Sequence, residues 1–124
     1  KLEGCFEFKG WVLGKEKSKL FKENSIFVLP SYFEGMPNSL LESMASGLAC
    51  IASNVGSVGD VLDGENGYVF NRETPEEFLT LLVKMILNEK SQVKIGLKAR
   101  EYIEKEHSLE MAIHNFADNV FSKI

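Results

Sequence analysis

The sequence has few cysteines, no long hydrophobic run and few basic residues in its middle third. Its two cysteines, Cys5 and Cys50, lie far apart in apolar surroundings, which predicts two small buried side chains in a reducing compartment and disfavours a disulfide or a metal site. No apolar stretch approaches the roughly 18 residues of a membrane span. Residues 1–4 contain no methionine and no signal-peptide pattern, so we expect a cytoplasmic location.

Basic residues are outnumbered, and the deficit is concentrated in one segment. The chain has 14 Lys and Arg against 18 Asp and Glu, a net charge of −4. This balance argues against a nucleic-acid-binding protein, which would carry a basic surplus. Between residues 38 and 75 one basic residue, Arg72, stands against five acidic ones. Such a segment would be unexpected in a site for an anionic ligand.

What is present indicates a single α/β domain over residues 1–124. The length suffices to bury a core without disulfides or metals. Short apolar runs predict strands at residues 5–9, 26–29, 49–52 and 68–70. Helical patterns are expected at residues 16–24, 38–47, 75–86, 91–106 and 108–124. This order predicts a Rossmann-like parallel sheet with flanking helices, whose ligand lies beyond the carboxyl ends of the strands. The loops 10–15, 31–38 and 53–59 are expected there.

The strand–loop–helix of residues 30–47 is the best candidate for a binding site. Gly35 permits a close approach of the backbone, and Glu34 and Glu42 present carboxylates suited to sugar hydroxyls. Helix starts bind phosphate through free amides. Three such amides are expected here, those of Asn38, Ser39 and Leu40. A structural explanation stays open, because a glutamate early in a helix favours the helix dipole and a loop glutamate can simply be solvated.

The same segment resembles the signature of family 4 retaining glycosyltransferases, which have the GT-B fold. The hallmark of that family is two glutamates separated by seven residues, here Glu34 and Glu42. Further matching pieces follow in the family's order and cover nearly the whole chain. They are FVLPS at 27–31, EGMP at 34–37, LLESMASG at 40–47, ACIASNVG at 49–56 and DGENGYVF at 63–70.

The resemblance implies the C-terminal, donor-binding half of an enzyme that moves a hexose from a nucleotide-diphospho-sugar to a glycan or lipid-linked acceptor. It implies no metal and no cofactor besides this donor substrate. Glu42 would bind the ribose hydroxyls, and Glu34, beside the hexose, would be the catalytic residue. The remaining contacts would be made by backbone groups. Those of Gly35, Met36 and Asn38 would line the sugar, those of Ser39 and Leu40 the diphosphate, and Gly10 and Val12 the base.

The resemblance also implies that parts of the enzyme lie outside this sequence. These are an N-terminal acceptor domain, upstream basic residues and two upstream strands. In the family's sheet those two strands lie between the strands expected at residues 5–9 and 26–29. We therefore expect an N-terminally truncated domain that is inactive alone, able to self-associate, and in contact with the inner face of the membrane through the missing domain. Asp60 stands where the family often has glutamate. The alternatives are a nucleotide-sugar epimerase of the same fold and a non-catalytic nucleotide-binding or partner-binding module.

Overall fold

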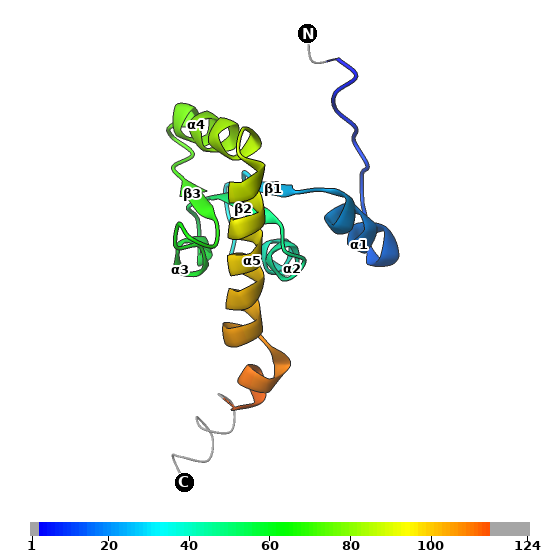
Figure 1. Cartoon of the computed structure of the whole chain (residues 1–124), viewed down its shortest axis with the longest axis vertical. Coiled ribbons are helices and arrows are strands. Elements are labelled where there is room, and N and C mark those ends of the chain that lie inside the picture. The colour runs from blue at the N-terminus through cyan, green and yellow to red at the C-terminus, as the bar shows by residue number, and fades with distance from the viewer. Residues whose placement is uncertain (1–2, 115–124) are drawn as a thin grey trace.

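The computed structural model describes residues 3–114, in which three parallel strands form a sheet with helices packed around it (Figure 1). The predicted α/β class is confirmed. The elements in chain order are α1 (Gly14–Glu23), β1 (Ile26–Leu29), α2 (Asn38–Ala45), β2 (Ala49–Ser53), α3 (Val58–Val61), β3 (Tyr68–Phe70), α4 (Pro75–Ile86) and α5 (Glu89–Glu106).

Strand β2 is the centre of the sheet. The strand order is β1-β2-β3, with Ile26 opposite Ala49 and Ile51 opposite Tyr68. All five residues of β2 are buried. A parallel strand covered on both faces is expected to be almost continuously apolar, and the sequence ACIAS meets that requirement with small side chains. The three predicted strands at residues 26–29, 49–52 and 68–70 are therefore confirmed.

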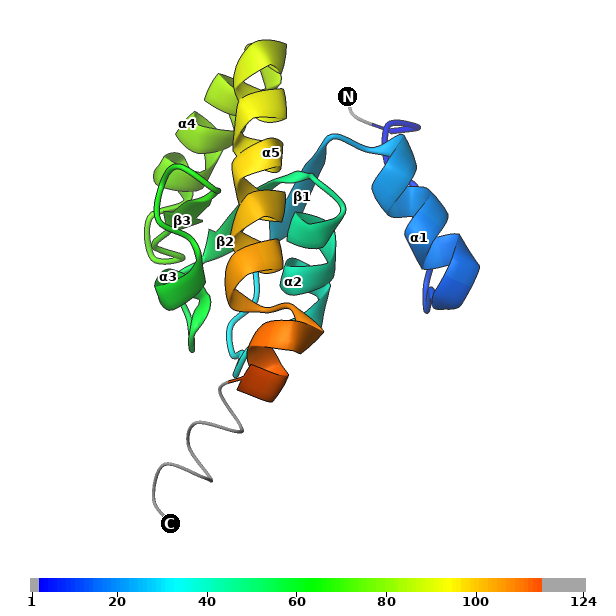
Figure 2. The same cartoon turned by 60° about the horizontal axis from the view of Figure 1, so that its bottom comes forward.

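The two faces of β2 belong to two separate hydrophobic clusters. Cys50 and Ala52 pack with α2, α3 and Ala99 of α5, whereas Ala49 and Ile51 pack with α4 and the earlier part of α5. This division follows from the alternation of side chains along a strand. Figure 2 shows α5 running alongside both α2 and α4, so that one helix contributes to both clusters.

The predicted strand at residues 5–9 is wrong. These residues have no regular secondary structure, and Figure 1 shows the segment running away from the sheet. Phe6 and Phe8 are 68% and 96% exposed, and Cys5 is exposed rather than buried. A strand forms only where its backbone groups make hydrogen bonds to a neighbouring strand. An apolar pattern alone does not supply a neighbouring strand. The helix expected at residues 108–124 lies largely outside the described residues.

The turn between α3 and β3 is built around a buried asparagine. Asn66 is 2% exposed; its Nδ2 donates to the Val61 carbonyl at 2.8 Å, and its Oδ1 accepts from the Asp63 N–H at 3.0 Å. The following residue, Gly67, has φ 159° and lies against Leu62 and the Cys50 carbonyl. The Asn66 side chain thus closes this turn as both donor and acceptor, and the Asp63 carboxylate accepts the N–H groups of Glu65 and Asn66.

Helix α5 meets the turn after α2 at the level of the backbone. A Cβ atom placed on Gly96 would lie 2.0 Å from the carbonyl oxygen of Gly47. Gly47 itself ends α2 with a φ of +79°, the left-handed conformation that favours glycine after a helix. No side chain fits between α5 and this turn.

Replacement of Gly96 by alanine should lower the free energy of unfolding by roughly 3 kcal/mol, because the added methyl group forces two packed backbones apart. The measurement is urea unfolding followed by circular dichroism. Leu97→Ala is the control, because Leu97 is 63% exposed on the same helix and meets no such contact. Equal urea midpoints for the two variants would contradict the proposed close packing.

Candidate functional site

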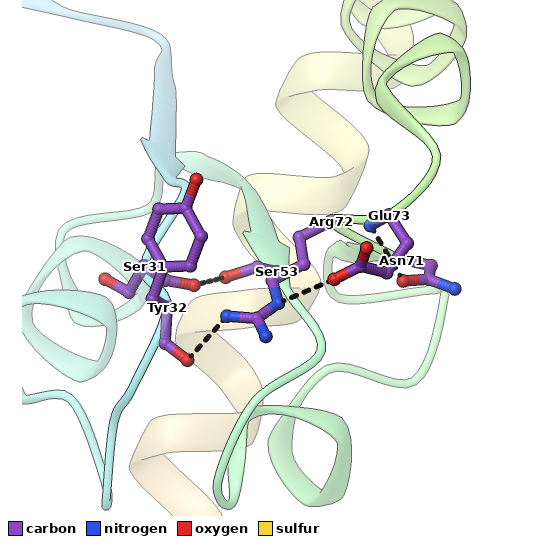
Figure 3. A network of polar contacts seen from close by, with 6 residues as sticks. All are labelled: Ser31, Tyr32, Ser53, Asn71, Arg72 and Glu73. Carbon is purple, nitrogen blue, oxygen red and sulfur yellow. Dashed lines mark hydrogen bonds and ion pairs between the residues drawn. The ribbon is translucent and has the colours of Figure 1, made fainter.

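The loop from Pro30 to Pro37 leaves the carboxyl end of β1 and leads into α2, as the sequence predicts. Its backbone is fastened to the neighbouring strand by Ser53, the last residue of β2. The Ser53 hydroxyl lies 2.6 Å from the carbonyl oxygen of Ser31 and 3.3 Å from that of Leu29 (Figure 3). Ser53 is 1% exposed, so this contact is shielded from water.

Within the loop, the Ser31 hydroxyl donates to Oε1 of Glu34 at 2.6 Å. Glu34 is half-buried. A hydrogen bond between a hydroxyl and a carboxylate is short and stronger than one between neutral groups. The carboxylate of Glu34 therefore has a fixed orientation on the loop.

A second loop, residues 54–57, supports the first from the side. The Ser57 N–H donates to the Gly35 carbonyl at 3.0 Å. Gly56 has a φ of +54°, and a Cβ atom there would lie 2.0 Å from the carbonyl oxygen of Glu34. Only glycine combines this left-handed conformation with so close an approach.

The third support comes from β3, through Arg72. Its Nη1 donates to the Tyr32 carbonyl at 3.2 Å, and its guanidinium carbon lies 4.9 Å from the centre of the Tyr32 ring. Its Nε lies 3.3 Å from Oε1 of Glu73. Figure 3 shows Arg72 reaching from the end of β3 to the loop after β1. All three strands thus contribute contacts to this loop at their carboxyl ends.

The start of α2 differs in one respect from the prediction. The N–H of Leu40 donates to the Pro37 carbonyl at 3.1 Å, and the N–H of Leu41 to the same oxygen at 3.3 Å. The expectation of a free Leu40 amide is therefore wrong, because the first turn closes tightly on Pro37. Within the described residues, the amides of Asn38 and Ser39 have no acceptor.

Glu42 has a partner that sequence reasoning missed. Nζ of Lys17 in α1 lies 2.5 Å from Oε2 of Glu42. Lys17 is half-buried and lies 5.8 Å from the ring centre of Phe21. The pattern of residues 16–24 predicts a surface helix but gives no signal of a partner in α2.

Two open cavities lie between α1 and α2. One, about 360 Å³, is lined by Gly10, Val12 and Ser39, three of the predicted site residues, together with Trp11 and Phe27. The other, about 490 Å³, is lined by Glu42. The two share Leu13, Lys17 and Phe21 as lining residues.

The predicted site residues thus fall into two groups. The first lines the cavities beside α1, and the second lies on the loop after β1 and at the start of α2. Glu34, Gly35, Met36 and Asn38 form the second group and do not line these two cavities. Leu40 is fully buried in the core.

Between residues 3 and 114, no helix is both long and apolar enough to span a bilayer.

The sequence model of the family described as "Glycosyl transferases group 1" matches residues 1–88. The chain belongs to this family. Sulfoquinovosyl transferase SQD2 of Arabidopsis thaliana is 32% identical over 102 residues, which are 79% of this chain and 20% of that protein. The amylovoran biosynthesis glycosyltransferase AmsK of Erwinia amylovora is 26% identical over 124 residues, 94% of this chain and 30% of that protein. The chain thus spans less than a third of these relatives.

Solved structures of glycosyltransferases share the fold. TarM superposes with a TM-score of 0.76 at 23% identity, covering 89% of this chain and 22% of that one. The C-terminal domain of LpcC, a glycosyl transferase group 1 family protein from Francisella tularensis, gives a TM-score of 0.70 at 24% identity, covering 81% and 52%. This likeness shows the fold, which is that of the C-terminal part of a GT-B glycosyltransferase.

Gly56→Ala should cost about 2 kcal/mol of unfolding free energy, because it combines an unfavourable φ with a clash against the Glu34 carbonyl. Gly59→Ala is the matched control: its Cβ would meet only the side chain of Asn54, at 2.6 Å, which can move aside. Urea unfolding of both variants is the measurement. A loss as large in Gly59→Ala as in Gly56→Ala would argue against a specific support of the loop by Gly56.

Proposed function

We propose that this chain is the donor-binding part of a family 4 retaining glycosyltransferase, which moves a hexose from a nucleotide-diphospho-sugar to a glycan or lipid-linked acceptor. The observation that carries the proposal is the placement of Glu34 and Glu42. One lies on the loop leaving β1 and the other one turn into α2, at the edge of the sheet where α/β folds bind ligands. The family membership of the chain supports it.

The names of two relatives support the proposed class of donor and acceptor. One relative, 34% identical over 67 residues, is the UDP-Gal:alpha-D-GlcNAc-diphosphoundecaprenol alpha-1,3-galactosyltransferase of Escherichia coli. Its name specifies a nucleotide-diphospho-sugar donor and a lipid-linked acceptor. Another is a capsular polysaccharide biosynthesis glycosyltransferase of Staphylococcus aureus. We extend this class of donor and acceptor to the present chain.

The diphosphate would bind at the start of α2. The amides of Asn38 and Ser39 have no acceptor in the described residues, and the positive end of the helix dipole adds to their attraction for an anion. Lys17 brings a basic group to the same side of α2 from a different element. With these groups, the acidic middle segment would bind the doubly charged diphosphate of the donor without a metal or a further cofactor.

Glu42 would bind the ribose with the oxygen that Lys17 leaves open. Lys17 contacts Oε2, so Oε1 can accept hydrogen bonds from sugar hydroxyls. The base would then enter the neighbouring cavity beside Gly10 and Val12, where Trp11 and Phe27 supply aromatic surface. The arrangement accounts for a nucleotide bound along the side of α2 that faces α1.

Glu34 would act on the hexose. Because Ser31 holds Oε1, the carboxylate has a defined position from which to accept hydroxyl groups of the sugar. The backbone groups of Gly35 and Met36 would line the sugar beside this carboxylate. In this assignment the hexose lies next to the loop, and the nucleotide lies beside α2.

The complete enzyme would place this chain beside an acceptor-binding domain. We propose a cytoplasmic location, with contact to the inner face of the membrane made through that second domain. We also propose that the 124 residues alone are inactive and can self-associate, because they span less than a third of the relatives that they match.

The test is donor binding and sugar transfer by the full-length protein with Glu42→Ala and Glu34→Ala. Loss of one charged hydrogen-bonding partner should weaken donor binding by about tenfold or more in Glu42→Ala. Glu34→Ala should mainly lower kcat, because its contact is to the reacting sugar. Isothermal titration with UDP-glucose, GDP-mannose and ADP-glucose measures the first effect, and product analysis measures the second.

Glu76→Ala on the exposed side of α4 is the control, and it should leave both quantities unchanged. Undiminished binding and transfer in the Glu34 and Glu42 variants would reject the site. Donor binding accompanied by sugar epimerisation would favour the nucleotide-sugar epimerase. Nucleotide binding without any reaction would favour the non-catalytic module.

A further inference from the structure

Arg72 occupies an unusual place for the one basic residue between positions 38 and 75. It follows β3 at the carboxyl edge of the sheet, beside the loop that carries Glu34. Although 38% of its side chain is exposed, it makes three directed contacts: with the Tyr32 carbonyl, the Tyr32 ring and the Glu73 carboxylate.

We propose that Arg72 is a positioning residue for the hexose end of the donor site: it fixes the loop that carries Glu34 by holding Tyr32. This proposal rests on the proposed function, since it assumes that Glu34 meets the donor sugar. Arg72 itself contacts no part of the donor in this assignment. Its effect passes through the backbone of residues 32–34.

The chemistry of the contact requires arginine. Nη1 donates to the carbonyl while Nε faces Glu73, and the planar group lies over the tyrosine ring. A guanidinium presents donors in a rigid fork and stacks on aromatic faces, whereas an ammonium is a compact point charge on a flexible stem. Lysine could preserve the attraction to the ring but could not hold the carbonyl and the carboxylate in the same geometry.

The hydrogen bond from Arg72 to Tyr32 supports the part of the loop that precedes Glu34 and that the other contacts do not reach. The Ser53 hydroxyl holds the carbonyl of Ser31, the Ser57 N–H holds that of Gly35, and the Gly56 backbone packs against the carbonyl of Glu34. Arg72 supplies the fastening at Tyr32, between Ser31 and Glu34. Without Arg72 the loop would still be held at the carbonyls of Ser31 and Gly35. The carbonyl of Tyr32, two residues before Glu34, would then have no partner from β3.

Strand β3 is held in place by hydrogen bonds that do not involve Arg72, so removal of Arg72 should not unfold the sheet. The Asn54 N–H donates to the Phe70 carbonyl at 2.9 Å, and the preceding turn is closed by Asn66. The Arg72 contacts lie beyond the last residue of the strand. An effect on binding can therefore be separated from an effect on stability.

The experiment compares Arg72→Ala with Lys84→Ala in the full-length protein. Lys84 is the matched control, because its ammonium lies 5.2 Å from the centre of the Tyr68 ring and its removal takes away a similar cation–ring contact far from the loop. Each variant is titrated with UDP-glucose, GDP-mannose and ADP-glucose, and with UMP, GMP and AMP. The monophosphates probe the nucleotide end of the site without the hexose.

Arg72→Ala should raise the Kd of the sugar nucleotide that the wild type binds by about tenfold, the size expected for one lost positioning hydrogen bond. The Kd of the corresponding monophosphate should change by less than about twofold, because effects at separated sites are nearly independent. Arg72→Lys should restore about a third of the lost affinity through its charge over the ring. Lys84→Ala should leave both constants unchanged.

Equal weakening of sugar nucleotide and monophosphate by Arg72→Ala, or equal effects of Arg72→Ala and Lys84→Ala, would overturn the proposal. If the wild type binds none of the six probes, the proposed function fails. Hydrogen exchange then tests the contact between Arg72 and Tyr32 by itself. Faster exchange of the Ser57 amide, which donates to the Gly35 carbonyl, in Arg72→Ala than in the wild type and Lys84→Ala supports it, and unchanged exchange refutes it.

Discussion

The backbone contact between Gly56 and the loop carrying Glu34 is the constraint on which the candidate site depends. It places two loops from adjacent strands against each other with no side chain between them. The Ser57 N–H and the Gly35 carbonyl form a hydrogen bond only because glycine allows this approach. The loop between β1 and α2 is therefore supported from β2 and β3 as well as by its own Ser31–Glu34 hydrogen bond, and its shape is a property of the whole sheet edge.

The charges of the middle segment follow from the same arrangement. A stretch with five acidic residues and one arginine has little free positive charge for an anionic ligand, and Arg72 is already bound to Tyr32 and Glu73. The anion-binding capacity of this edge is therefore assigned mainly to backbone amides at the start of α2, because Lys17 from α1 is likewise paired, with Glu42. Amides and helix dipoles are preorganised and add no formal charge, so they act in an acidic segment without forming competing ion pairs.

The sequence predicts those parts of the fold that short-range patterns determine. The runs IFVL and ACIA are bounded by breakers, and both form strands; the helix after Pro37 begins where expected. Residues 5–9, CFEFK, alternate apolar and charged side chains but have no partner strand in the described chain, and pairing is not encoded locally. The contact of Lys17 with Glu42 and that of Arg72 with Tyr32 join distant positions, so no local spacing predicts them. The tight turn that occupies the Leu40 amide depends on backbone angles that the residue types do not specify. Within the candidate site, the positions of Glu34 and Glu42 on loop and helix and the free amides of Asn38 and Ser39 could be deduced in advance.

The buried turn before β3 has a consequence for the chemical lifetime of the protein. Asn66 precedes Gly67, and an asparagine followed by glycine is the pair most prone to spontaneous deamidation, through attack of the next backbone nitrogen on the side-chain amide. Here both parts of that amide are engaged, with Val61 and Asp63, and the residue is 2% exposed. The native fold thus protects this bond from ageing. In an unfolded chain the protection is lost, and the aspartate formed could no longer donate to the Val61 carbonyl. The longer the chain spends unfolded, the more molecules would carry a deamidated residue that closes this turn poorly. Conformational stability would therefore also determine how long the protein stays chemically intact.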